Sequence, residues 1–94
     1  QIALDAFSGT LITDSIEKET TQVMENIQAI LQAAEMDFSN VVKCSIFLSD
    51  MGTFPKVNEV YGKFFDENPP ARETVEVSKL PRNVNVEISV IAVR

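Results

Sequence analysis

The residues best suited to chemistry lie at 68–72, Asn-Pro-Pro-Ala-Arg, where Arg72 stands directly before the strand-forming run at 74–77. Each proline fixes φ and lacks an N–H donor, so the backbone reaches Arg72 from a defined direction. A guanidinium held in this way can bond two oxygens of a carboxylate or phosphate. The residues alone leave two interpretations open, an anion-binding clamp and a solvent-facing arginine at the start of a strand.

Composition excludes several common kinds of active site. The chain has no histidine, which removes Ser-His and Cys-His nucleophiles and the commonest metal ligand. Cys44 is the only cysteine, so thiolate metal clusters and intrachain disulfides are excluded, and its apolar neighbours favour a buried, inert thiol over a reactive one. Three scattered glycines cannot build a phosphate loop. An enzyme with this sequence would use carboxylates, an arginine, backbone groups and water, and needs no cofactor.

Length and charge limit the number of domains and the kinds of partner that the protein is expected to have. Ninety-four residues suit one domain, and 45% apolar and 23% charged residues are close to the values of ordinary soluble proteins. A net charge of −6 disfavours binding to nucleic acid or to an anionic membrane surface, which would require clustered Lys and Arg. The sequence has neither a transmembrane run nor a secretory signal pattern at its start, so we expect a cytoplasmic location.

Two amphipathic helices are predicted to position these residues. Asp14 and Glu17 have the spacing of a capping box, so we expect the first helix to begin after Asp14 and to end before Glu35. The second helix carries Pro55 in its first turn, and Tyr61 is a core aromatic without a catalytic role. The two apolar stripes comprise Ile16, Val23, Met24, Ile27, Ile30, Leu31 and Ala34, and then Phe54, Val57, Tyr61 and Phe64 or Phe65.

Three strands are predicted, at 41–49, 73–79 and 84–93, and we expect the last two to form a strand pair beside Arg72. One face of the first strand is formed by Val42, Cys44, Ile46 and Leu48, and one face of the last by Val84, Val86, Ile88, Val90 and Ala92. The element order predicts one α+β domain over residues 1–94, with both helices on one face of a mixed sheet. A sheet this thin, with an apolar final strand, indicates that further strands or other subunits cover it.

The chain resembles the RidA/YjgF/YER057c/UK114 family of reactive-intermediate deaminases along its whole length. Each matching motif is weak alone, but their order and spacing together are specific. The motifs are Gln-Ile-Ala-Leu-Asp at 1–5 with Gly9, Gln-Val-Met-Glu-Asn-Ile at 22–27 with Ala-Ile-Leu at 29–31, Val-Val-Lys at 41–43, Phe-Leu-Ser-Asp-Met at 47–51, Phe54, Val-Asn-Glu-Val-Tyr at 57–61, Pro-Ala-Arg at 70–72, Leu-Pro at 80–81, Val-Glu-Ile at 86–88 and Ile-Ala-Val at 91–93.

The resemblance implies a chorismate-mutase-like α+β subunit that assembles as a homotrimer with a substrate cleft at each subunit interface. Family members hydrolyse enamines and imines, released by pyridoxal-phosphate enzymes such as threonine dehydratase, to 2-keto acids and ammonia. By resemblance, Arg72 binds the substrate carboxylate and Glu87 places or activates water, so both are catalytic. Thr74 offers its backbone amide to the ligand, and Asn58 borders the same cleft. From the residues alone, an exposed strand carboxylate is the favoured interpretation of Glu87. Asn58 is equally interpretable as a helix-surface amide, and Thr74 as a strand former.

The chain differs from the family pattern in three places, and each difference has an expected consequence. The family has about two more strands before the residue matched by Gln1, so we expect the N-terminal part of the family domain to be missing from this chain. Glu73 follows Arg72 where the family has a small serine or threonine, and its charge would weaken the binding of an anionic substrate. Glu35 stands where a glycine is usual and makes a poorer helix C-cap.

Two functions other than deamination are carried as alternatives. The first is a non-catalytic, regulatory trimer that binds small carboxylates, which Glu73 and the missing N-terminal strands favour. The second is an RNA-cleaving translation inhibitor, which the charge of −6 and the lack of histidine disfavour.

Overall fold

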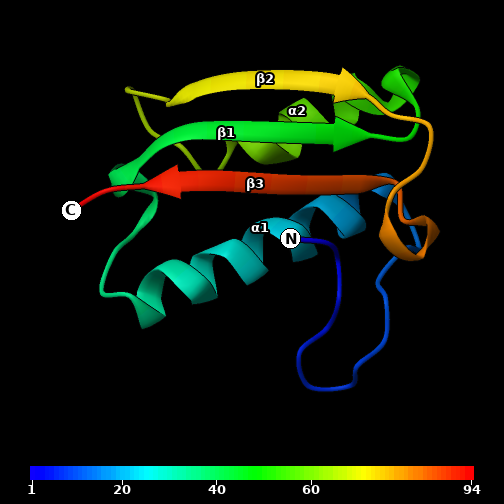
Figure 1. Ribbon diagram of the computed structural model, residues 1–94, viewed down its shortest axis with the longest axis horizontal. Coiled ribbons are helices and arrows are strands. Elements are labelled where there is room, and N and C mark those ends of the chain that lie inside the picture. Colours follow the sequence, from blue (N-terminus) through cyan, green and yellow to red (C-terminus); the bar gives the residue numbers. More distant parts are fainter.

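Two helices cover one face of a three-stranded sheet (Figure 1). The computed structural model describes residues 1–94. In chain order the elements are α1 (Ile16–Ala33), β1 (Val41–Leu48), α2 (Phe54–Gly62), β2 (Ala71–Glu76) and β3 (Val86–Ala92), with short 3-10 helices at Phe38–Asn40, Met51–Thr53 and Pro81–Asn83. This arrangement confirms the predicted α+β class, with both helices on one face of a mixed sheet. No helix is both long and apolar enough to cross a membrane.

The sheet has the order β2-β1-β3, with β2 parallel and β3 antiparallel to β1. The expected pairing of the last two strands is therefore wrong, because β1 lies between them. Helix α2 provides the crossover that a parallel pair requires. The polar strand β2 takes an edge, where Arg72, Glu73 and Glu76 are exposed, whereas apolar β1 takes the buried centre.

The register assigns each strand residue to one face of the sheet. Cys44 is level with Arg72 on β2 and Val90 on β3, and Ile46 is level with Thr74 and Ile88. Cys44 and Ile46 are fully buried, so the residues level with them also belong to the face that the helices cover. The residues between them belong to the opposite face, which no element of this chain covers and which we call the open face.

Strand β1 contains a bulge that moves one valine to the surface. The register with β3 shifts between Val41 and Lys43, so Val42 is the extra residue. Val41 is 6% exposed and packs in the core, whereas Val42 is 47% exposed. The prediction that Val42 shares the buried face was therefore wrong, although Cys44, Ile46 and Leu48 do share it.

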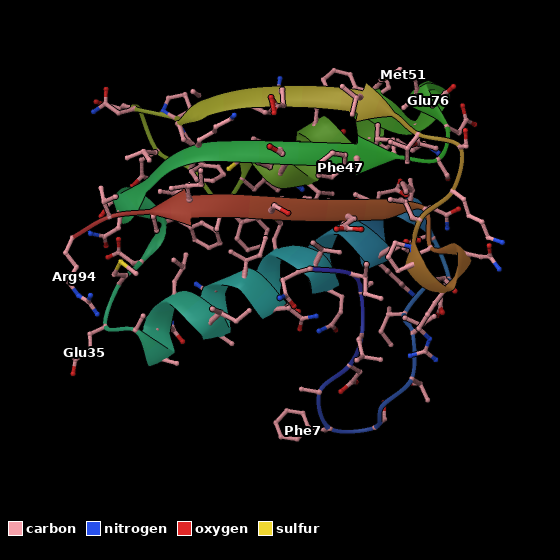
Figure 2. The ribbon with its side chains drawn as sticks, in the orientation of Figure 1. Phe7, Glu35, Phe47, Met51, Glu76 and Arg94 are labelled. Carbon is pink, nitrogen blue, oxygen red and sulfur yellow. The ribbon has the colours of Figure 1, made fainter.

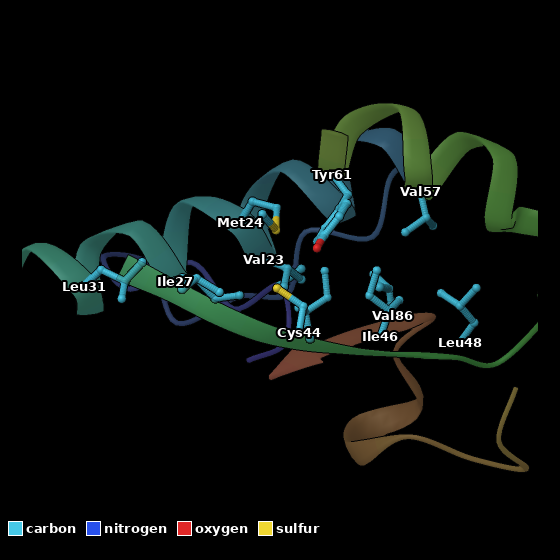
Figure 3. Close-up of a cluster of buried hydrophobic side chains, with 13 residues drawn as sticks. Val23, Met24, Ile27, Leu31, Cys44, Ile46, Leu48, Val57, Tyr61 and Val86 are labelled. Carbon is cyan, nitrogen blue, oxygen red and sulfur yellow. The ribbon is translucent and has the colours of Figure 1, made fainter. Parts of the chain in front are cut away.

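Helix α1 supplies much of the core and ends before Glu35 as expected, but its N-cap differs from expectation. Its N-cap is Ser15, not Asp14, because Ser15 has extended backbone and its Oγ accepts from the Lys18 N–H at 3.1 Å. The predicted stripe is buried at Val23, Met24, Ile27 and Leu31, which Figure 3 shows together with β1 and α2, but Ile30 is 52% exposed.

Glu35 ends α1 in a left-handed conformation, with φ of 59°. The Glu35 N–H donates to the Gln32 carbonyl at 3.0 Å and the Met36 N–H to the Leu31 carbonyl at 2.8 Å. These two bonds form a Schellman motif, in which glycine is the usual residue at this position. The left-handed conformation is thus the physical reason for expecting Glu35 to be a poorer C-cap than glycine. The Arg94 guanidinium donates to the Ala34 carbonyl at 2.7 Å near the same helix end (Figure 2).

The N-terminal segment pairs with the outer edge of β3. The Gln1 amino group donates to the Ile88 carbonyl at 2.7 Å, and the Ile88 N–H donates to the Gln1 carbonyl at 3.0 Å. The Asn26 side chain, on α1, holds the same segment by donating to the Ile2 and Leu4 carbonyls at 3.0 and 2.9 Å. The chain then turns through Gly9, whose φ of 72° is accessible to glycine at no steric cost.

Candidate functional site

Arg72 is held against α2 before any ligand arrives. Its guanidinium carbon lies 5.3 Å from the centroid of the Phe54 ring and 5.2 Å from that of the Tyr61 ring, within cation–π range. Its Nη1 donates to the Asn58 Oδ1. The structure thus brings together Arg72 and Asn58, two of the predicted site residues, and adds two aromatic rings that restrict the guanidinium.

A cavity of about 420 Å³ opens beside this arginine. It is lined by Asn58, Tyr61, Gly62, Phe65, Asp66, Pro69, Pro70 and Arg72. Its volume falls in the usual range of small-molecule sites, and Arg72 is the only basic side chain in its wall. The two prolines form part of the wall, as expected for a segment that directs the chain toward Arg72.

A larger cavity of about 780 Å³ lies next to it and shares Phe65 and Asp66. Its other lining residues are Phe38, Ser39, Phe64, Glu67 and Asn68. The acidic side chains Asp66 and Glu67 and the absence of any basic residue from this wall make it unsuited to a carboxylate. The charges of the lining residues therefore favour the smaller cavity over the larger as a carboxylate-binding site.

Beneath Arg72, Tyr61 and Cys44 lie buried in the core, and Figure 3 shows the Tyr61 hydroxyl directed toward Cys44. Burial raises the pKa of the Cys44 thiol above its usual 9.0 and also raises the pKa of the Tyr61 hydroxyl. Neither group is poised to ionise near neutral pH, which agrees with the interpretation of Cys44 as a buried, inert thiol. No group of three or more His, Cys, Asp or Glu side chains is arranged to hold a metal ion.

Thr74 lies two residues beyond Arg72 on the same face of β2, level with Ile46. Its Oγ1 is buried without a hydrogen-bond partner, so the side chain is directed inward. The Val77 N–H donates to the Leu48 carbonyl at 2.8 Å, across the β1–β2 ladder. Since N–H groups of an edge strand alternate between the ladder and the free edge, the Thr74 N–H is directed away from β1, toward the free edge.

Glu87 lies apart from the other predicted site residues. It is level with Phe47 on the open face of the sheet, where Figure 2 labels Phe47, whereas Arg72 belongs to the face that the helices cover. Their two strands are separated by β1 and lie about 10 Å apart. Arg72 and Glu87 are also offset along the sheet, because they are level with Cys44 and Phe47, three residues apart on β1. A single chain therefore does not bring Arg72 and Glu87 to one ligand.

Glu73 also belongs to the open face. Its Oε2 lies 3.6 Å from the Lys43 Nζ and accepts from the Ser45 Oγ at 3.0 Å. Strand alternation thus directs its charge away from Arg72 and pairs it with a lysine. Within this chain, the expected electrostatic conflict between Glu73 and an anion on Arg72 has no geometric basis.

Phe54 and Tyr61 are the site residues that sequence reasoning assigned only to the core. Their spacing contains the signal that could have found them. Phe54, Asn58 and Tyr61 follow one another at steps of four and three, which places them on one face of a helix. A polar residue between two aromatics on an otherwise apolar stripe indicates a place where a charged group from another element meets the helix.

Comparisons with known proteins identify the family of this chain. The family model described as endoribonuclease L-PSP matches residues 1–94. Protein DfrA of Myxococcus xanthus is 50% identical over 93 residues, which cover 99% of this chain and 71% of that protein. The 2-iminobutanoate/2-iminopropanoate deaminase of Mus musculus is 44% identical, over 100% of this chain and 70% of that protein.

A solved structure shows the same fold. The crystal structure of E. coli TdcF with bound serine superposes with a TM-score of 0.94 at 36% identity, covering 100% of this chain and 76% of that chain. The predicted resemblance is thereby confirmed in sequence and in structure. The chain belongs to the endoribonuclease L-PSP family, the group to which its RidA/YjgF-like motifs pointed.

Proposed function

We propose that this protein hydrolyses reactive 2-imino and enamine acids to 2-keto acids and ammonia. The observation that carries the proposal is Arg72, restrained by Asn58 and two aromatic rings at the mouth of a cavity of about 420 Å³. A relative 44% identical is named a 2-iminobutanoate/2-iminopropanoate deaminase, and TdcF holds a serine, a small molecule with a carboxylate.

Arg72 supplies orientation in this proposal. Its fork bonds the substrate carboxylate, and the outward-directed Thr74 N–H offers a further donor at the free edge of β2. Because the guanidinium is already restrained, little conformational entropy is lost when the carboxylate binds. Asn58 shares the guanidinium with the ligand and keeps it in place when the cavity is empty.

Glu87 supplies water to the imine carbon, and it does so from another copy of the chain. An imine carbon is already electrophilic, so hydrolysis requires an oriented substrate, a placed water and a path for protons. The water adds to the carbon, the nitrogen takes a proton, and the amine leaves as ammonia while the C=O bond forms. Since Arg72 and Glu87 lie on opposite faces of one sheet, we place the reaction at an interface between copies, as in the expected homotrimer.

Association of copies is supported by the open face. Val42, Val75, Ile91 and Val93 are 47, 42, 56 and 53% exposed. Val75 and Ile91 belong to the open face, as does Phe47. Apolar side chains gathered on an uncovered face are typical of a surface that another subunit covers.

The test couples the purified protein to a threonine dehydratase and follows 2-ketobutyrate formation. We expect the wild type to accelerate the release of 2-ketobutyrate and Arg72→Ala to lose about 100-fold or more in kcat/KM, since two charge-assisted hydrogen bonds are removed. Arg82→Asn is the matched control. Arg82 is exposed in the Pro81–Asn83 turn with a φ of 55°, which asparagine tolerates. No acceleration by the wild type, or equal rates for Arg72→Ala and Arg82→Asn, would contradict the proposal.

A non-catalytic carboxylate-binding function is the second candidate, and the separation of Arg72 from Glu87 within one chain favours it. Calorimetric titration with 2-ketobutyrate distinguishes the two functions. Binding that depends on Arg72 without any turnover would establish the binding function in place of the enzyme.

A further inference from the structure

Glu19 is a carboxylate with no exposed surface, in the first turns of α1. Glutamate is rarely buried to this degree unless it is paired. No lysine or arginine lies within ion-pair distance of Glu19, whose contacts are all N–H donors. Its position near the helix N-terminus favours a negative charge, and its contacts lie at the start of β3, which Figure 1 shows beside this end of α1.

The Glu19 carboxylate binds the two residues that directly precede Glu87. Its Oε2 accepts from the backbone N–H of Asn85 at 2.8 Å and from that of Val86 at 3.2 Å. Its Oε1 accepts from the Asn85 Nδ2 at 2.8 Å. One buried side chain thus fixes the backbone where β3 begins, one residue before the carboxylate that the proposed reaction uses.

The outward-facing backbone N–H groups on both sides of Glu87, at the outer edge of β3, are hydrogen-bonded. The Val86 N–H is bound by Glu19, and the next outward N–H, that of Ile88, donates to the Gln1 carbonyl at 3.0 Å. Glu87 itself is level with Phe47 on the β1 side. The peptide that carries Glu87 is therefore held from both edges, so its side chain leaves the open face in a fixed direction.

We propose that Glu19 is a positioning residue for Glu87: it has no contact with substrate and acts by fixing the start of β3. This inference rests on the proposed function, because it gives Glu19 a part in the same hydrolysis. A purely structural role would lower the amount of folded protein without changing the turnover of the molecules that remain folded.

The first experiment measures kcat and KM of Glu19→Ala in the dehydratase-coupled assay, per folded molecule. We expect kcat to fall by about 10- to 100-fold, since a small displacement of a catalytic group has effects of this size, and KM to stay within about twofold because Arg72 is untouched. Val23→Ala is the control, since Val23 is fully buried on the same helix but does not contact β3 through a hydrogen bond. In a Glu87→Gln background, the effect of Glu19→Ala on kcat should vanish.

A second pair of variants keeps the test decisive if Glu19→Ala does not fold. Asn85 is exposed, and Asn85→Asp would place a second carboxylate against the Glu19 Oε1. We expect this change to lower kcat, and Glu19→Gln combined with Asn85→Asp to restore it, because the glutamine amide can donate to the new carboxylate. Unchanged kcat in folded Glu19→Ala or Asn85→Asp, or an equal loss in Val23→Ala, would overturn the inference.

Failure of the proposed function and failure of this inference give different results. If the wild type does not hydrolyse imines, the function fails, and carbon-detected NMR of the Glu87 carboxyl group decides the inference alone. A shifted Glu87 carboxyl signal and faster hydrogen exchange of the Val86 amide in Asn85→Asp, reversed in the double variant, support positioning by Glu19. An unshifted Glu87 signal rejects it.

Discussion

The two faces of the sheet are built from the same three strands but differ in what they contact. The covered face presents Cys44 and Ile46 to the helices, with no exposed surface, and holds Arg72 at its edge. The open face mixes apolar Phe47 and Val75 with charged groups, Glu87 among them. The difference teaches that strand alternation divides the proposed catalytic pair. In the proposed reaction, Arg72 therefore binds the ligand from the covered face and Glu87 acts from the open face of another chain.

The largest expected effect contrasts the stability contributed by the two faces. Ile46→Ala removes a fully buried side chain from the covered face and should lower the free energy of unfolding by about 2–5 kcal/mol. Val75→Ala, on the open face at 42% exposure, should cost the separated chain no more than about 0.5 kcal/mol. Urea denaturation at low protein concentration measures both. Equal losses would mean that the open face is packed within one chain and does not differ from the covered face in stability.

Ligand binding on the covered face should depend on the forked shape of the Arg72 guanidinium as well as on its charge. Arg72→Lys keeps the charge but loses the two-pronged fork and the stacking on Phe54 and Tyr61. We expect the affinity for 2-ketobutyrate, measured by calorimetry, to fall about 10-fold or more, corresponding to one lost charge-assisted hydrogen bond. Lys43→Arg on the open face is the control and should leave the affinity unchanged. An affinity retained by Arg72→Lys would show that charge alone binds the ligand.

Alkaline pH should weaken the covered face selectively. The pKa values of Cys44 and Tyr61 are raised in the folded protein, so the fold favours their protonated forms. This contribution is complete below the usual thiol pKa of 9.0 and is lost as the pH rises above it, because the unfolded chain then releases protons more readily. The urea midpoint should fall between about pH 9 and pH 10.5 in the wild type, and less in Cys44→Ala. Equal slopes in both proteins would remove Cys44 as the cause.

The smallest expected effect tests whether the faces are electrostatically independent. Glu73→Thr removes the open-face charge that pairs with Lys43, a pair in which both side chains are about half exposed, at 49 and 48%. We expect 2-ketobutyrate affinity to change by less than about twofold and stability by less than about 1 kcal/mol. A gain in affinity of tenfold would show that the Glu73 charge acts on the ligand despite its direction, and would restore the expectation drawn from the sequence.

Sequence reasoning predicted the elements well but not their neighbours in space. The apolar stripes and the alternation on β1 and β3 follow from local periodicity, and so do Arg72 and Asn58 as candidates. The order β2-β1-β3 does not, because pairing depends on which strand can be buried on both edges. The bulge at Val42 is equally invisible, since it arises from matching two distant strands and not from the residues around it.

In the site, too, features set by neighbouring residues could be predicted, whereas contacts between distant parts of the chain could not. The aromatic neighbours of Arg72 were present in the spacing of α2, yet their meeting with β2 follows only from the crossover. The sequence pattern gives no sign that Glu19 differs from an ordinary surface residue of an amphipathic helix. The positioning role proposed for it depends on its contacts with Asn85 and Val86, which lie more than sixty residues away in the chain. Long-range contacts of this kind are where local patterns lose their predictive value.

The left-handed Glu35 offers a practical means of studying all these variants. A residue with a Cβ at this φ costs about 1 kcal/mol or more, whereas glycine adopts it freely. Glu35→Gly lies at the far end of α1 from Glu19 and outside the cavity beside Arg72. It would give a more robust parent protein, in which destabilising changes such as Ile46→Ala or Glu19→Ala could be purified and assayed in folded form.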